Sequence, residues 1–130
     1  MPASEVQVPK MRFGGVDISR VVVGCNPFLG TSHFNATINA IMGQYYTPER
    51  VADVLHQCTR FGINTYNYHH NERAYPGLQR FQAEGGQMHL IVQDWGDPVG
   101  VYKAVKPVGM YYLGEYTDRA FQDDEMDNVR

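Results

Sequence analysis

Hydrophobic and polar positions alternate along the chain in blocks that predict strands and helices in turn. Residues 11–13 and 16–18 alternate about Gly14-Gly15, a turn pair that accepts positive φ, and so predict a hairpin. The β-branched run at residues 21–23 predicts a strand covered on both faces. Residues 28–46 mix glycine, asparagine, serine and aromatic residues without a clear period, which predicts a long surface loop.

The clearest helix is predicted from Thr47 as N-cap and Pro48 at the first helical position to Gly62, which ends it. Its apolar residues recur at three- and four-residue spacing. Further blocks predict strands at 63–68, 88–92 and 109–113 and helices at 76–84 and from 98 to before Pro107. Another helix is expected from Asp123, and the sequence stops within it, as if cut.

This alternation predicts a parallel α/β sheet built from right-handed crossovers. A doubly wound domain would fit the length, but the chain has no G-x-G-x-x-G turn and no Walker loop. The predicted hairpin and the interrupted last helix favour the N-terminal half of a (β/α)8 barrel, about four β/α units. The expected organisation is a tail at residues 1–10 and a partial barrel at 11–130.

Composition narrows the class of protein. The chain has 130 residues, a formal net charge of −3 and 43% apolar residues, which is typical of soluble globular proteins and argues against a nucleic-acid binder or a disordered chain. It contains no apolar run of membrane-spanning length and no secretory signal, so we expect a cytoplasmic protein that does not bind membranes. Its two cysteines, Cys25 and Cys58, are expected to be reduced and mostly buried.

Two segments carry a resemblance to a known family. The run MRFGGVDISRVVVGCNPFLG, followed by TPERVADVLHQCTRFGINTYNYHHN, resembles the opening of the aldo-keto reductase superfamily. The resemblance covers Met11 to about Asn71. It implies a (β/α)8 barrel that reduces carbonyl compounds with NADPH at the carboxyl ends of its strands. The family uses a Tyr proton donor supported by a Lys and an Asp, and a His that orients the carbonyl.

The resemblance places these four roles on residues of other types. The Asp position falls on Asn67, and the Tyr position falls on Glu72, with Tyr75 close enough to replace it. The Lys position falls near Gln93 and Asp94. Without the Lys and the Asp, a phenol of ordinary pKa about 10 lacks the charges that tune it toward neutrality.

The remaining implied positions follow the first and fourth predicted strands. The His position falls at Gly114, with Glu115 next to it. Gly24, Cys25 and Asn26, in the bend after the first strand, are the implied cofactor contacts. The family's cofactor phosphates are gripped mainly by the second half of its barrel, so tight NADPH binding is not expected from these residues alone.

Metal-ligating residue types also follow the predicted strands. Imidazoles and carboxylates from successive strand ends could converge on one divalent metal ion that polarises a carbonyl or activates water. The candidate ligands are His69, His70, Asp94 and Glu115, with Glu72 and Asp118 nearby. Within a strand, His69 and His70 point to opposite sides, so at most one would face such a site.

Two classes of function therefore stay open. One is an aldo-keto reductase-like oxidoreductase with a non-standard active site, inactive as this piece alone, acting on a carbonyl, sugar or polyol. The other is a non-catalytic binding or assembly protein, and metal-assisted lyase or isomerase chemistry is a further alternative. Unpaired barrel edges would also favour self-association.

Overall fold

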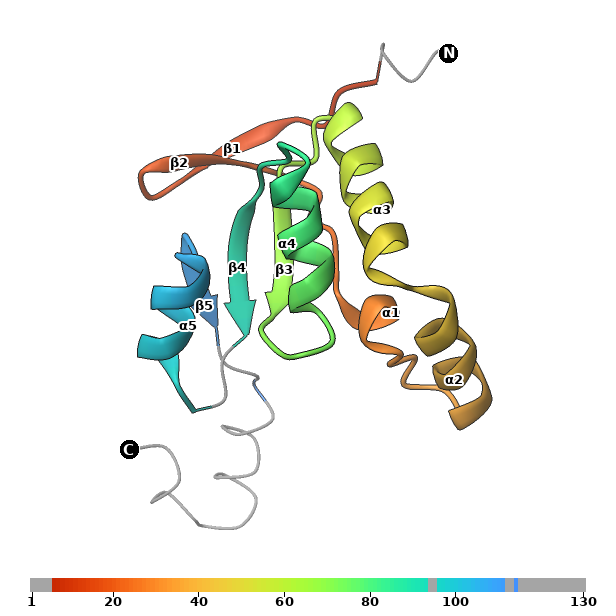
Figure 1. Ribbon diagram of the computed structural model, residues 1–130. Coiled ribbons are helices and arrows are strands. Elements are labelled where there is room, and N and C mark those ends of the chain that lie inside the picture. The colour runs from red at the N-terminus through yellow and green to blue at the C-terminus, as the bar shows by residue number, and fades with distance from the viewer. Residues whose placement is uncertain (1–5, 94–95, 112–113, 115–130) are drawn as a thin grey trace.

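An antiparallel hairpin opens the described part of the chain (Figure 1). The computed structural model describes residues 6–93, 96–111 and 114. Strands β1 (Lys10–Phe13) and β2 (Val16–Ser19) pair from Lys10 opposite Ser19 to Phe13 opposite Val16. Gly14 adopts φ +54°, the conformation that its turn requires. The predicted hairpin is confirmed.

A parallel sheet of three strands forms the centre of the fold. Its strands β3 (Thr65–His69), β4 (His89–Gln93) and β5 (Gly109–Tyr111) lie side by side in sequence order. Helix α4 (Tyr75–Ala83) connects β3 to β4, and helix α5 (Pro98–Val105) connects β4 to β5. Helix α3 (Pro48–Arg60) precedes β3 and is capped by the Thr47 hydroxyl, as predicted. The predicted α/β alternation is confirmed for these elements.

The prediction of half a (β/α)8 barrel is wrong. The described residues form a two-stranded antiparallel sheet and a separate three-stranded parallel sheet, not four β/α units. The predicted strand at residues 21–23 is reduced to one bridge: the Val23 N–H donates to Thr65 O at 3.0 Å, and Val23 O accepts from the Asn67 N–H at 2.8 Å. Val21 is 51% exposed, so this run is not covered on both faces. After Val23 the chain bends and enters the helix that begins at Asn26.

The predicted loop at residues 28–46 is also wrong, because two helices occupy most of this segment. Helix α1 (Asn26–Leu29) ends at Gly30, and α2 (Ala36–Tyr45) begins after Asn35, whose side chain accepts the Ile38 N–H at 2.8 Å. Helix α2 buries no residue. Its inner side carries polar and small residues, so the sequence lacks the inward-facing apolar period by which a helix is usually predicted.

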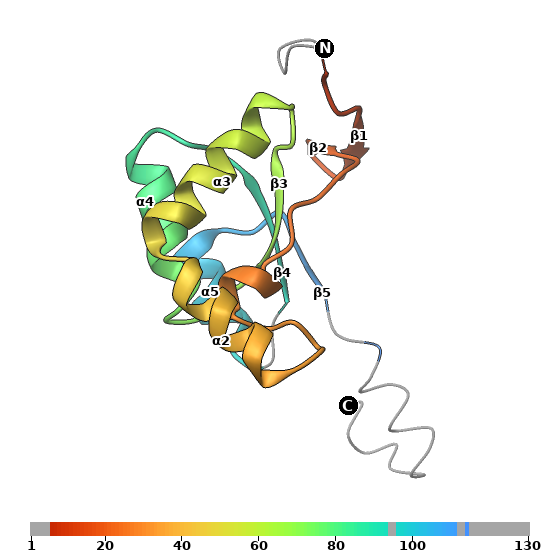
Figure 2. The ribbon, with the colours of Figure 1, turned by 90° about the vertical axis from the view of Figure 1, so that its right-hand side faces the viewer.

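Helices α3, α4 and α5 cover one face of the parallel sheet (Figure 2). Alternate strand residues point to this face, where Tyr66, Tyr68, Leu90 and Val92 are buried. They belong to one core with residues of α3 and α4, which include Val51, Leu55, Leu78 and Phe81. The apolar stripe predicted for α3 thus packs as expected against the sheet and α4.

The opposite face of the sheet carries the other half of each strand. The hairpin lies across its amino-terminal end: the Ser19 N–H donates to Asn64 Oδ1 at 2.7 Å, and a Cβ on Gly109 would meet the Phe13 ring at 3.0 Å. Toward the carboxyl end the side chains on this face are polar and partly exposed. We call this side the helix-free face.

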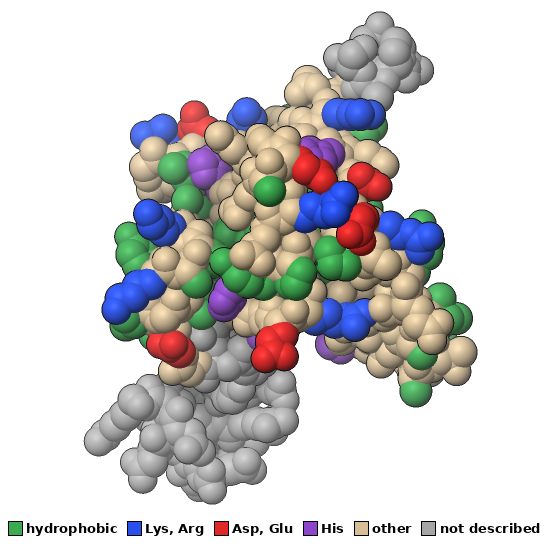
Figure 3. All heavy atoms as spheres, viewed as in Figure 1, with side chains coloured by type: hydrophobic (Ala, Val, Ile, Leu, Met, Phe, Trp, Pro, Cys, Tyr) green, Lys and Arg blue, Asp and Glu red, His purple; other side chains and the backbone are tan. Residues whose placement is uncertain are grey.

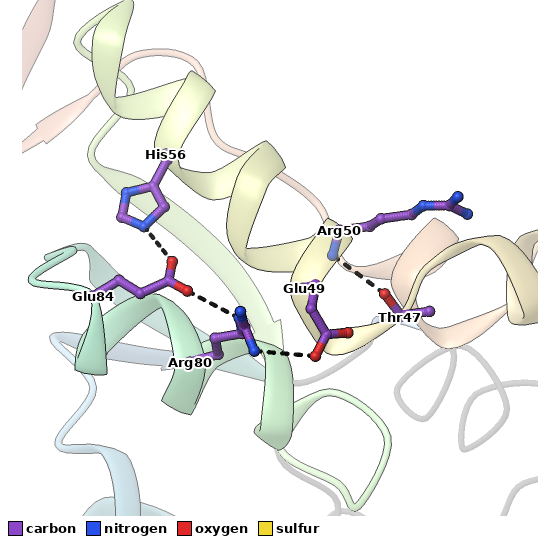
Figure 4. Close-up of polar contacts among 6 residues, drawn as sticks. All are labelled: Thr47, Glu49, Arg50, His56, Arg80 and Glu84. Atoms are coloured by element: carbon purple, nitrogen blue, oxygen red, sulfur yellow. Dashed lines mark hydrogen bonds and ion pairs between the residues drawn. The ribbon is translucent and has the colours of Figure 1, made fainter.

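A row of charged side chains links α3 to α4 on the outer surface (Figure 4). Glu84 accepts from His56 and from Arg80, each at 2.9 Å, and Arg80 also reaches Glu49 at 3.1 Å. The backbone N–H of Glu49 and the hydroxyl of Thr47 lower the pKa of the Glu49 carboxyl. All these groups are well exposed, so each pair contributes little to stability.

Within the described ranges, no helix combines the length and the apolar character needed to cross a bilayer.

Two neighbouring core tyrosines should respond differently to loss of the hydroxyl. Tyr66 is fully buried and its hydroxyl has no partner among the described residues, whereas the Tyr68 hydroxyl bonds to His70 Nδ1 at 3.0 Å. Tyr66→Phe removes an unsatisfied group and should leave stability unchanged or raise it by up to about 1 kcal/mol. Tyr68→Phe should cost about 1 kcal/mol. Urea unfolding measures both, and a larger loss in Tyr66→Phe would contradict this packing.

Gly77 sets the closeness of α3 and α4. A Cβ at Gly77 would lie 2.6 Å from Val51 Cγ1. Although alanine favours helices, Gly77→Ala should therefore destabilise the fold by about 1–2 kcal/mol through overpacking. The double variant Val51→Ala/Gly77→Ala should lose less than the sum of the single changes in urea unfolding. Additive losses would show that the two residues are not in contact.

Candidate functional site

Three polar side chains meet on the helix-free face near the carboxyl ends of the strands. The Tyr111 hydroxyl lies 2.8 Å from Asn67 Oδ1 and 3.1 Å from Gln93 Oε1. All three residues are partly exposed. We call this group the amide–phenol cluster.

The sheet register assembles this cluster. Tyr111 on β5 lies opposite Gln93 on β4, and Asn67 lies on β3, two residues before His69, which pairs with Gln93. The Tyr111 side chain therefore reaches across β4 to a strand that is not its neighbour. Because residues two apart share a face, the same pleat that buries Tyr66, Tyr68 and Val92 presents the cluster on the other side.

The cluster offers hydrogen bonds without charge. A phenol has one proton, so Tyr111 donates to one of the two amide oxygens at a time, and the other oxygen can then accept a bond from a ligand. Each amide also carries an NH2 donor. Donors and acceptors thus alternate within a few ångströms, an arrangement that suits a neutral ligand with paired hydroxyl or carbonyl groups.

A second group follows β3. His70 Nδ1 lies 3.0 Å from the Tyr68 hydroxyl, and the His70 ring meets the Tyr75 ring edge to face at 4.9 Å between centroids. Burial raises the pKa of the Tyr68 phenol, which therefore stays neutral at physiological pH. This group brings an imidazole beside two phenols where the chain leaves the sheet.

The bend after residue 23 holds the implied cofactor contacts. Cys25 is 8% exposed, and burial raises the pKa of its thiol, an effect that a hydrogen bond from the His69 backbone only partly offsets. Asn26 Nδ2 lies 3.1 Å from His33 Nε2, and Gly24 is exposed. These residues offer no cation for cofactor phosphates, and their role as NADP contacts stays a prediction.

The predicted site residues separate into groups. Asn67 belongs to the amide–phenol cluster, and Tyr75 lies against His70 in the second group, which follows β3. Glu72 is exposed in the turn before α4. Asp94 and Glu115 lie outside the described residues.

In the part of the chain that the structure describes, the residues predicted to bind a metal ion do not form an assembled ligand set. There, no three His, Cys, Asp or Glu side chains gather closely enough to hold an ion. His69 is the last residue of β3, and His70, just beyond the strand, lies against Tyr68 and Tyr75. A site completed by Asp94 and Glu115 stays a prediction.

Sequence reasoning missed Tyr111 as a site residue. It had placed Tyr111 on the last predicted strand, but a link to Asn67 depends on the register across β4. The available signal was weak: Asn67 sits on the less apolar face of a predicted strand, and Gln93 directly follows the predicted strand at 88–92.

Comparisons with protein-family models, with curated proteins and with solved structures find no match to this chain. The resemblance to aldo-keto reductases therefore remains a resemblance.

The buried thiol of Cys25 should react slowly. In a Cys58→Ser variant, Cys25 should react with a disulfide reagent at pH 8 at least tenfold more slowly in the native protein than after unfolding, because burial limits both access and thiolate formation. Since the pKa is raised, the native rate should continue to rise above pH 9. Equal rates in native and unfolded protein would mean that Cys25 is an accessible thiol.

Proposed function

We propose that this protein binds a small neutral sugar, polyol or carbonyl compound at the amide–phenol cluster. The observation that carries the proposal is the bonding of Tyr111 to Asn67 and Gln93 on the helix-free face. The cluster lies near the carboxyl ends of the three parallel strands, on the face that the helices leave uncovered. The proposal requires no barrel.

The chemistry of the three side chains favours this ligand class. A sugar hydroxyl both donates and accepts, and an amide presents both functions at fixed spacing. An anionic ligand such as a phosphate ester would favour Arg or Lys, and neither amide nor phenol supplies a positive charge. The geometry supports recognition, so the non-catalytic binding function weighed from the sequence is the better-supported one.

Ligand binding can be measured by NMR titration of the labelled chain with xylitol, glucose and glyceraldehyde. We expect at least one to bind, with shifts centred on β3, β4 and β5. Tyr111→Phe and Gln93→Ala should each weaken binding at least fivefold, because each removes one hydrogen bond worth about 1 kcal/mol.

Matched controls come from the helices. Tyr102→Phe on α5 and Gln82→Ala on α4 make the same chemical changes at exposed positions outside the cluster and should leave binding unchanged. The proposal fails if none of the three compounds binds the native chain. It also fails if the cluster variants bind as tightly as the controls.

Aldo-keto reductase-like chemistry is a second candidate. The contact between His70 and Tyr75 favours it, because the phenol could donate a proton to a carbonyl that the imidazole orients. The test measures the oxidation of NADPH in the presence of glyceraldehyde, with the loss of nicotinamide absorbance as the readout. Turnover by the native chain that is lost in Tyr75→Phe would support this candidate. If the native chain shows no turnover, this candidate fails and only the binding function is left.

A further inference from the structure

An aromatic ring of the hairpin rests on the helix-free face beside the amide–phenol cluster. A Cβ on Gly109 would lie 3.0 Å from Cε1 and 3.2 Å from Cζ of Phe13, so a side chain at this position would press on the ring. The backbone of Gly109 is not in the left-handed region that favours glycine. Its small size is therefore what the position uses, because it lets the Phe13 ring lie directly on the sheet.

The sheet register continues this surface to the cluster. Ile91 on β4 pairs with Gly109 on one side and with Asn67 on the other. Its Cγ2 lies 3.9 Å from the point that a Gly109 Cβ would occupy. Residues opposite each other on neighbouring strands share a face, so an amide, an isoleucine and the Phe13 ring follow one another across the sheet. We call Phe13 and Ile91 the apolar border of the cluster.

Both residues of the apolar border present surface to solvent. Phe13 is 37% exposed and Ile91 is partly exposed, whereas the core residues Phe28 and Phe81 are 4% and 0% exposed. Packing of the hairpin on the sheet thus uses only part of the Phe13 ring. The rest of the ring is open to a ligand that the cluster holds.

The three parallel strands carry no charge that would attract an ionic ligand. Strands β3, β4 and β5 contain no Lys, Arg, Asp or Glu. Arg12, next to Phe13 in the hairpin, lies on the other face of β1 and pairs with Asp17 at 3.4 Å. Charged side chains of both signs lie on the helix-covered side, which Figure 3 shows. The surface around the cluster therefore suits a neutral ligand that is partly apolar.

A cyclic sugar combines these properties. A pyranose carries hydroxyl groups around its rim and patches of C–H groups on its faces, so it can bond to amides while it lies against an aromatic ring. An open-chain polyol or a three-carbon carbonyl compound has no such rigid apolar face. Neighbouring strands are about 4.8 Å apart, so the apolar border and the cluster lie within reach of one sugar ring.

We propose that Phe13 and Ile91 bind the C–H face of a cyclic sugar whose hydroxyl groups the amide–phenol cluster holds. The apolar border thereby selects a pyranose over an open-chain polyol of the same size. This selection rests on the proposed function of the cluster and narrows its ligand class.

NMR titration of the full chain with glucose and with sorbitol, its open-chain alcohol, tests the selection. The native chain should bind glucose about fivefold more tightly than sorbitol or better, because only glucose buries a rigid apolar face. Phe13→Ala should weaken glucose binding about fivefold and change sorbitol binding by less than about twofold.

A matched control and a second variant accompany this change. Phe61, which follows α3 outside the site, is 36% exposed, so Phe61→Ala removes a ring of equal exposure and should leave both affinities unchanged. Gly109→Val keeps the Phe13 ring but displaces it, and it should weaken glucose binding as Phe13→Ala does. Circular dichroism checks that each variant stays folded.

A direct readout needs no variant. In the native chain with bound glucose, the ring protons of Phe13 should show nuclear Overhauser effects to the C–H protons of the sugar. Absence of these effects while glucose is bound overturns the role of Phe13, whatever the variants do.

The outcomes separate this selection from the proposed function. If sorbitol binds the native chain as tightly as glucose, or if Phe13→Ala binds glucose like Phe61→Ala, the selection is wrong while the binding function of the cluster stands. If the native chain binds neither glucose nor any open-chain compound, both are wrong.

Discussion

The burial of one face of the parallel sheet beneath α3 and α4 is the constraint on which the rest of this structure depends. Gly77 lets α3 and α4 approach closely above the face that buries Tyr66, Tyr68, Leu90 and Val92. Removing this apolar surface from water supplies the main driving force for folding. Once that face is fixed, strand pleating leaves no freedom in which residues occupy the other face.

The strand order explains where the candidate site lies. The strands follow one another in sequence, and their crossover helices all lie on one side. Such a sheet has no reversal of strand order and therefore no crevice between two sets of helices. On the helix-free face the hairpin covers the amino ends of the strands, and the amide–phenol cluster occupies the carboxyl ends, which is why the proposed ligand site lies there.

Local signals allowed the sequence to predict the hairpin, α3 and the positions of β3, β4 and α5. Thr47 and Pro48 mark a helix start whatever the surrounding fold. The barrel prediction failed because coverage of Val21–Val23 depends on distant residues, which leave Val21 exposed. Helix α2 escaped notice because its apolar side faces outward, and Tyr111 because its partners are set by register. Asn67 was named from a family position, and the structure gives it the Tyr111 hydroxyl as neighbour.

The alternation of β3 and β4 has an evolutionary consequence. Tyr66, Tyr68, Leu90 and Val92 of these strands pack into the core, whereas Asn67 and Gln93, toward the carboxyl ends, lie on the opposite side of the pleat. Under the proposed binding function, selection on recognition and selection on foldability act on interleaved but separate positions. Such a strand can exchange its outward-facing side chains while its core-facing side chains stay fixed. A new binding specificity is then accessible without a prior gain in the stability of the fold.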